Sequence, residues 1–233
     1  MKRKRLVLFV EGEGDQKAVP VLVKRLLTEA RAWDKIILDP DPFKVRSHGA
    51  LAKDNYESWT NKLRAAAKRS NVGGVLLVLD GDEKSRTGEV FCARRAAAEL
   101  ATRAHAAGGG KLFSVAVVFA LQEYESWLIA GVKSLAGRPL SGNLRGVLPG
   151  TAPPDGDLEA SPREAKEWLS KFMPDGYKPT THQQPLSEIV DIATIRERHL
   201  RSFRRFENAV RELVTAMSTA DPICTPHNVP ASN

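Results

Sequence analysis

The sequence predicts an α/β protein with a four-stranded, mainly parallel sheet flanked by helices and followed by a C-terminal helical extension. Two runs, GVLLVLD at 74–80 and KLFSVAVVFA at 111–120, are nearly continuous in apolar residues, as strands buried on both faces are. Such runs alternate with helical patterns through the first half of the chain, which is typical of a parallel sheet covered by helices. With 233 residues, the chain is long enough to bury a full core.

The predicted elements of the first half alternate between strand and helix. The strands are expected at 5–10, at two weaker candidates for the second strand (35–38 and 43–47), at 74–80 and at 111–120. Apolar side chains at helical spacing predict helices over 17–32, 56–70 and 88–107, the last of them ended by three glycines. Together these elements are expected to form an α/β core over residues 1–136.

The second half is predicted to be mainly helical. The segment LQEYESWLIAGVKSLAG is expected to form a helix, and Gly and Pro mark residues 137–160 as a loop or linker. A helical extension packed on the core is expected over 161–218, with helices at 161–171 and 186–217. The longer helix carries an apolar stripe that we expect in the core, formed by Phe203, Phe206, Val210, Leu213 and Met217. Residues 219–233 are expected to form a flexible tail.

Composition argues against several classes of protein. No apolar run approaches the roughly 20 residues that cross a membrane, and the run after MKRKR is too short for a signal peptide. Cys92 and Cys224 lie far apart without Cys or His at metal-ligand spacing, which favours neither a disulfide framework nor a zinc site. We therefore expect a cytoplasmic protein. Its formal net charge of +7 favours an anionic partner such as nucleic acid.

Acidic residues follow three of the predicted strands. Glu11 comes directly after the first strand, Asp80 and Asp82 end the third, and Glu123 and Glu125 follow the fourth. Residues i and i+2 of an extended segment point the same way, and the carboxyl ends of parallel strands meet at one edge of a sheet. We therefore expect these five carboxylates to gather at that edge.

Gathered carboxylates resist ionisation unless a positive charge lies among them. Oxygen ligands select Mg²⁺ or Mn²⁺ over zinc, so the sequence predicts a Mg²⁺ (or Mn²⁺) site formed by Glu11, Asp80, Asp82, Glu123 and Glu125. Phosphoryl or phosphodiester chemistry is typical of such a site. The alternative is that acidic residues at strand ends serve as turn formers and helix caps, which is the role expected for Asp15.

The sequence does not meet the requirements of other ligand-binding and catalytic motifs. GEGDQK at 12–17 has Lys17 where a dinucleotide fingerprint needs a third glycine, and it lacks the Gly-Lys-Ser/Thr of a P-loop. The five histidines show no metal-ligand spacing, and no nucleophile elbow accompanies them.

The pair Glu11-Gly12 after the first strand and the D-x-D of Asp80 and Asp82 after the third resemble the Toprim domain of topoisomerases, primases and OLD-type nucleases, over about residues 5–130. LFVEGEGDQKAVPVLVKRLL, ALQEYESWLIA and YKPTTHQQPLSEIVDI are also similar to an uncharacterised bacterial family classed as Toprim-like. Members of that family resemble proteins encoded beside ATPases in phage-defence gene clusters. The resemblance implies a Toprim-like sheet, with Glu11 as general acid/base or metal-positioning group and Asp80 and Asp82 as magnesium ligands.

The same resemblance implies that Glu123 and Glu125 form an additional acidic pair of the family. The catalytic set is then Glu11, Asp80 and Asp82, with Lys84 close in sequence to stabilise the phosphate. Contacts with a nucleic-acid backbone are expected from Arg94, Arg95, Lys166, Arg201, Arg204 and Arg205. For the arginines of 201–205 and for Lys166, a solvated helix surface is the alternative.

The expected function is a Mg²⁺-dependent Toprim-like nuclease in phage defence or repair, acting with a separate ATPase partner. The chain has no topoisomerase tyrosine domain, zinc ribbon or ATPase module, which argues against strand passage or priming by this chain alone. Two alternatives stay open: a non-catalytic regulatory or assembly subunit, and a small-molecule phosphohydrolase. Whether the chain forms a homodimer is left open as well.

Overall fold

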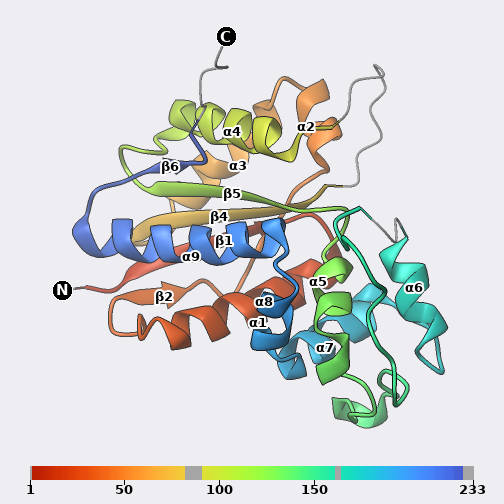
Figure 1. Ribbon diagram of the computed structural model, residues 1–233. Helices are drawn as coiled ribbons and strands as arrows, with labels where there is room; N and C mark the ends of the chain where they lie inside the picture. Colours follow the sequence, from red (N-terminus) through yellow and green to blue (C-terminus); the bar gives the residue numbers. More distant parts are fainter. Residues whose placement is uncertain (1, 82–90, 161–163, 228–233) are drawn as a thin grey trace.

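The computed structural model describes residues 2–81, 91–160 and 164–227, and its centre is a sheet in which every strand pairing is parallel (Figure 1). The described strands are β1 (Lys4–Val10), β2 (Ile36–Leu38), β3 (Phe43–Lys44), β4 (Val72–Asp80), β5 (Ser114–Ala120) and β6 (Cys224–Thr225). Their order is β2-β1-β4-β5-β6, and β3 also pairs with β1. The α/β prediction with a parallel sheet is therefore confirmed.

The helices cover both faces of this sheet and extend beyond it. They are α1 (Glu13–Glu29), α2 (His48–Lys53), α3 (Glu57–Ala67), α4 (Ala93–Ala104), α5 (Glu125–Ala130), α6 (Ala165–Lys171), α7 (Gln184–Ile189), α8 (Ile192–Glu197) and α9 (Arg201–Thr219). Among the described residues, three short 3-10 turns lie at His105–Ala107, Val132–Ser134 and Ser141–Asn143, and one π-helical turn lies at Pro179–Gln183.

The central strands are apolar on both faces because each face has its own core. Leu6, Leu8 and Val10 of β1 pack with α1, α5 and α9, whereas Val7 and Phe9 pack with α3 and α4. This alternation follows from the two-residue period of a strand. Figure 1 shows α9 and α1 below the sheet and α3 and α4 above it. The apolar stripe of α9 is buried in the first of these cores, as expected.

The predicted number of four strands is wrong, since the described residues form six. Both weak candidates for the second strand are real: β2 pairs with the first half of β1, and β3 pairs with its second half. The sixth strand comes from the segment expected to be a flexible tail, where Cys224 and Thr225 are buried beside β5. The two-residue β6 carries too little periodicity to be recognised in the sequence.

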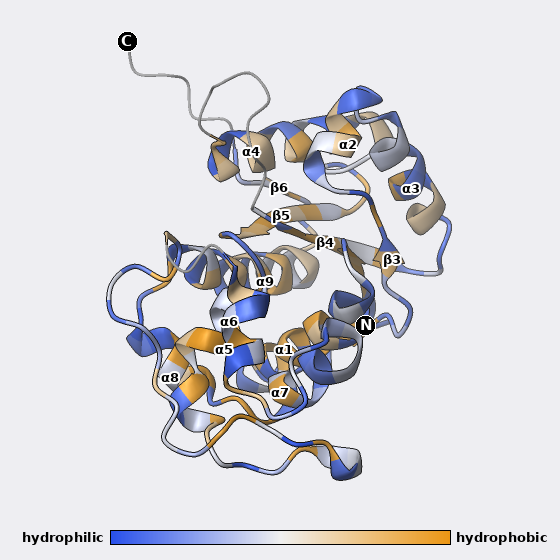
Figure 2. Cartoon of the chain, turned by 90° about the vertical axis from the view of Figure 1, so that its right-hand side faces the viewer, coloured by the Kyte–Doolittle hydropathy of each residue, from blue (hydrophilic) through white to orange (hydrophobic). Residues whose placement is uncertain are grey.

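The predicted helix over 186–217 is divided into α7, α8 and α9. Asp191 separates the first two and accepts a 2.9 Å hydrogen bond from the N–H of Ala193 as the N-cap of α8. His199, between α8 and α9, has a φ of +53° that a helix does not allow. The α5–α8 region lies beside α1, at the end toward which the strands run (Figure 1). Figure 2 colours parts of α5, α7 and α8 as hydrophobic, and buried apolar residues of these helices belong to the same core as those of α1.

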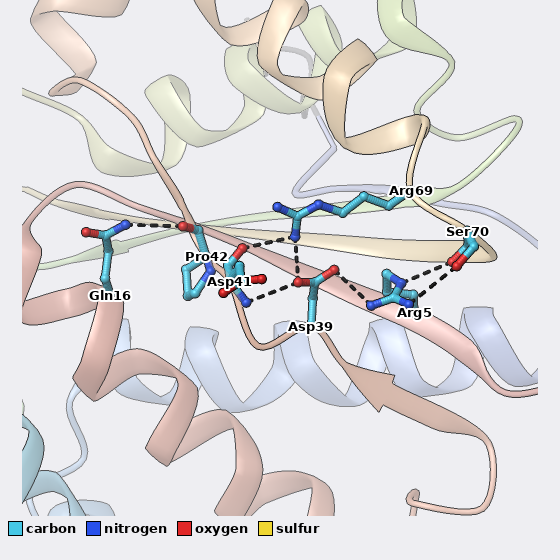
Figure 3. Close-up of polar contacts among 7 residues, drawn as sticks. All are labelled: Arg5, Gln16, Asp39, Asp41, Pro42, Arg69 and Ser70. Atoms are coloured by element: carbon cyan, nitrogen blue, oxygen red, sulfur yellow. Dashed lines mark hydrogen bonds and ion pairs between the residues drawn. The ribbon is translucent and has the colours of Figure 1, made fainter.

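A buried ion-pair group joins the amino-terminal end of β1 to neighbouring segments of the chain. Asp39, which follows β2, is 2% exposed, and its carboxylate lies 3.1 Å from Nη1 of Arg5 and 2.5 Å from Nη1 of Arg69 (Figure 3). Arg5 also donates to Ser70, so that β1, β2 and the turn before β4 are joined. This buried carboxylate therefore has two arginine partners.

Within the described ranges, no helix combines the length and apolar character that crossing a bilayer requires.

Candidate site at the carboxyl edge of the sheet

The carboxyl ends of three neighbouring strands are joined by hydrogen bonds. The N–H of Asp80 donates to Oε2 of Glu11 at 3.4 Å, which links β4 to β1. The N–H of Tyr124 donates to Oδ1 of Asp80 at 3.0 Å, which links β4 to the segment after β5. The N–H of Gly81 donates to the carbonyls of Ala120 and Gln122, and a Cβ at position 81 would lie 3.0 Å from the Ala120 oxygen. A side chain at position 81 would therefore crowd the Ala120 carbonyl.

Asp15 lies at the same edge, on the first turn of α1. Its Oδ2 accepts the N–H of Gly12 at 2.8 Å, and its Oδ1 accepts Nε2 of Gln183 at 2.6 Å. The first contact stabilises the helix N-terminus, in line with the expected cap. The second joins α1 to the π-helical turn, and Gly14 permits it because a Cβ there would lie 1.9 Å from Oε1 of Gln183.

Glu123 and Glu125 share one lysine. Nζ of Lys166, on α6, lies 2.5 Å from Oε1 of Glu123 and 3.8 Å from Oε2 of Glu125. The hydroxyl of Tyr177 donates to Oε1 of Glu125 at 2.9 Å. The Oε2 atoms of both glutamates are buried and accept no hydrogen bond from the described residues.

Burial and neighbouring carboxylates raise the pKa of Asp80 and the pKa of Glu125. The pKa of Asp80 is raised well above its ordinary value, chiefly by burial and then by the negative charges of Asp15 and Glu125. Lys166 lowers this pKa, and Glu11 raises it further. Burial raises the pKa of Glu125 to about 7, with Lys166 opposing and Glu123 adding. Burial lowers the pKa of Lys166, but Glu125 and Glu123 outweigh it and hold this pKa above its ordinary range. We call Glu11, Asp15, Asp80, Glu123 and Glu125 the acidic cluster.

A chain of buried polar groups, joined by hydrogen bonds, lies next to the acidic cluster. The Ser187 hydroxyl donates to the Gln183 carbonyl at 2.6 Å, so the Tyr124 hydroxyl, 2.7 Å from Ser187 Oγ, is the donor of that pair. Burial raises the pKa of the Tyr124 hydroxyl well above its ordinary value, which keeps this donor protonated. Sequence reasoning did not identify Tyr124, Tyr177, Gln183 or Ser187 as part of the site. Tyr177, Gln183 and Ser187 lie in the polar run YKPTTHQQPLSE, which resembles a solvated loop.

The structure brings Glu11, Asp80, Glu123 and Glu125 to one edge of the sheet, as expected. Asp82 and Lys84 lie outside the described residues. Among the residues that are described, no three His, Cys, Asp or Glu side chains are arranged so that they could hold a metal ion.

The residues predicted to bind nucleic acid differ in their surroundings. Lys166 lies in the acidic cluster. Arg201 pairs with Glu159, and Arg205 pairs with Glu212 and Thr225, so both contribute to the fold. The side chains of Arg94, Arg95 and Arg204 are exposed, as a contact with a nucleic-acid backbone would require.

The fold and this edge define an α/β protein whose parallel sheet carries a carboxylate-rich site at its carboxyl end. The chain matches the family described as a domain of unknown function, DUF4276, over residues 10–211, and it belongs to that family. No curated protein and no solved structure matches the chain. None of these comparisons names a Toprim domain or an OLD-type nuclease, so nuclease activity stays a prediction.

Proposed function

We propose that this protein is a divalent-metal-dependent phosphodiesterase acting on nucleic acid at the acidic cluster. The observation that carries the proposal is the convergence on Asp80 of three further carboxylates, Asp15, Glu125 and Glu11, each of which raises its pKa. Within the described residues, Lys166 is the cation that forms ion pairs with members of the cluster. Asp39, by contrast, has two arginine partners.

The chemistry of the donors suits a hard divalent cation, although the described residues alone do not form a three-ligand group. All members of the cluster offer carboxylate oxygens, and the Oε2 atoms of Glu123 and Glu125 lack hydrogen-bond donors among the described residues. Glu11 and Asp80 are adjacent, and Asp82 is the further ligand expected from the sequence. When bound, such a cation would offset the negative charge that develops on a phosphodiester during hydrolysis.

The residues of the chain have separate parts in this proposal. Asp80 and Glu11 would hold the ion, and the Tyr124 N–H would keep the Asp80 carboxylate in its orientation. Glu11 is also the group proposed to accept or return a proton, a role that rests on the Toprim resemblance. The exposed side chains of Arg94 and Arg204 would contact phosphates without reading sequence.

One observation favours a second function, a non-catalytic subunit that binds nucleic acid or a separate ATPase. Lys166 and Tyr177 already contact Glu123 and Glu125, so that half of the acidic cluster has internal partners. In this second proposal the cluster is a structural device, and cleavage requires another protein.

The two functions are tested by metal binding and cleavage measured on the same variants. Thermal unfolding is followed while Mg²⁺ or Mn²⁺ is titrated, since an ion that binds only the folded state raises the midpoint. Cleavage is measured on circular and linear DNA. The variant is Asp80→Ala with Asp82→Ala, and the control is Asp34→Asn, an exposed carboxylate before β2 at the opposite edge of the sheet.

The phosphodiesterase proposal expects a rise in midpoint at millimolar metal and cleavage in the wild type and in Asp34→Asn. It expects the double variant to lose both while it still binds DNA. Absence of a metal-dependent rise in the wild type overturns the proposal. Metal binding and DNA binding without cleavage favour the non-catalytic subunit.

A further inference from the structure

We propose that Lys166 is an exchangeable counter-ion, which leaves Glu123 and Glu125 when a divalent cation binds and thereby frees their oxygens for the ion. The inference deepens the proposed function, because it rests on metal binding at the acidic cluster. It makes Lys166 an internal competitor of the metal rather than a contact for the substrate.

Lys166 occupies the position of a bound cation. Its Nζ lies between two carboxylates, 2.5 Å from Oε1 of Glu123 and 3.8 Å from Oε2 of Glu125. The side chain of Glu123 is 12% exposed and that of Glu125 is 1% exposed, so both carboxylates are largely buried. The lysine balances part of the negative charge of this pair when no metal is present.

The lysine does not satisfy its partners completely. The Oε2 atoms of Glu123 and Glu125 are buried and have no hydrogen-bond donor among the residues described. Two carboxylates face one ammonium, which leaves a net negative charge, whereas a divalent ion balances both. Asp39 is the contrasting case, because two arginines match its single carboxylate.

The geometry also allows exchange. The Lys166 side chain is 36% exposed, and it projects from the first turn of the seven-residue helix α6, so that the ammonium can turn toward solvent. Glu125 cannot follow it, because the hydroxyl of Tyr177 holds its Oε1. The carboxylates therefore stay in place while the lysine departs.

The first experiment measures metal affinity by calorimetric titration of the purified full chain with Mn²⁺ alone. Lys166→Gln removes the competing charge, and Lys171→Gln, an exposed lysine of the same helix, is the matched control. We expect Lys166→Gln to bind Mn²⁺ at least about tenfold more tightly than the wild type, since a like charge that competes with the ion is removed. Lys171→Gln should bind as the wild type does. Equal affinity in Lys166→Gln and Lys171→Gln overturns the inference, and so does weaker binding in Lys166→Gln.

The second experiment uses the wild-type protein and covers the case in which Lys166→Gln does not fold. Lysines are acetylated briefly with and without Mn²⁺, and the modified positions are quantified by mass spectrometry. Release of Lys166 predicts a several-fold rise in its acetylation on adding Mn²⁺, with Lys171 unchanged. Unchanged or reduced acetylation of Lys166 overturns the inference.

The two proposals fail in different ways. If Mn²⁺ binds and Asp80→Asn abolishes binding, while Lys166→Gln leaves the affinity unchanged, the metal site stands and the exchange is refuted. If the wild type and Lys166→Gln both bind no Mn²⁺, the proposed function and the exchange are refuted together.

Discussion

The backbone N–H of Tyr124 donates a 3.0 Å hydrogen bond to Oδ1 of Asp80, so the end of β4 is held by the segment that follows β5. An asparagine at position 80 keeps an oxygen for this bond and removes a charge that the neighbouring carboxylates disfavour. In EDTA at pH 8, Asp80→Asn should therefore have a higher free energy of unfolding than the wild type. Asp80→Ala should fall below Asp80→Asn by about 1–3 kcal/mol, because the N–H loses its acceptor. Denaturant titration measures all three proteins, and Asp80→Ala at or above Asp80→Asn contradicts this account.

The pKa of Glu125 makes stability depend on pH with a defined sign. Burial raises this pKa from 4.5 to about 7. The folded protein thus holds the proton more tightly than the unfolded chain, and the free energy of unfolding falls as pH rises from 4.5 to 7. Glu125→Gln lacks this effect, so its stability relative to the wild type should be higher at pH 8 than at pH 4.5 by at most about 3 kcal/mol. Denaturant titrations in EDTA at the two pH values test this, with the exposed Glu197→Gln as the control.

Glu159 stabilises the start of α9 from a distant part of the chain. Its Oε1 accepts the N–H of Ser202 at 2.6 Å, and its Oε2 lies 2.9 Å from Nε of Arg201. A negative charge at a helix N-terminus is favourable. Glu159→Gln should lower the free energy of unfolding by about 1 kcal/mol and Glu159→Ala by about 2 kcal/mol, since alanine also leaves the N–H without this acceptor. Equal stability of Glu159→Ala and the wild type would show that solvent replaces the carboxylate.

Gly14 should respond to alanine in the direction opposite to an ordinary helical glycine. Alanine normally stabilises a helix interior relative to glycine by up to about 1 kcal/mol. In α1, however, the new Cβ would lie 1.9 Å from Oε1 of Gln183 and 2.9 Å from Cβ of Pro179. Gly14→Ala is therefore expected to destabilise the protein by about 1–3 kcal/mol in chemical denaturation. A stabilised Gly14→Ala would mean that the π-helical turn packs less closely on α1 than described.

Arg94 and Arg204 are the positions at which a nucleic-acid contact can be tested without harm to the fold. Both side chains are exposed, and neither forms a hydrogen bond or ion pair with the described residues. Each glutamine substitution should weaken DNA binding and reduce the dependence of log affinity on log salt by about one. The thermal midpoint should stay unchanged. Fluorescence anisotropy at several salt concentrations measures the slope, and unchanged slopes in both variants exclude these contacts.

The sequence was sufficient for the α/β class, the long strands and the acidic edge. Long apolar runs identify β1, β4 and β5. When these strands lie side by side in parallel, their geometry brings Glu11 next to Asp80. Of the short strands, β2 and β3 fall within the two weak candidates at 35–38 and 43–47, whereas β6 was not predicted. Their two or three residues pair only because β1 and β5 offer open edges.

The supporting side of the site was less accessible to prediction. Tyr177, Gln183 and Ser187 are polar, lie more than 50 residues from their partners and come from a segment rich in turn formers. Their burial is decided by how α7 and the π-helical turn pack on α1, a long-range contact that no local pattern reports. For Lys166, likewise, helical spacing suggested a surface position, whereas its contact with Glu123 arises from the packing of α6 beside α5.

The last strand has a consequence for handling the protein. β6 covers part of the outer side of β5, pairing at Val115 and Ala116, and an uncovered strand edge is a template for pairing with other chains. A truncation before Cys224 would therefore expose backbone donors and acceptors of β5 and promote self-association. Shortened versions made for crystallisation or NMR spectroscopy should retain the chain through Thr225.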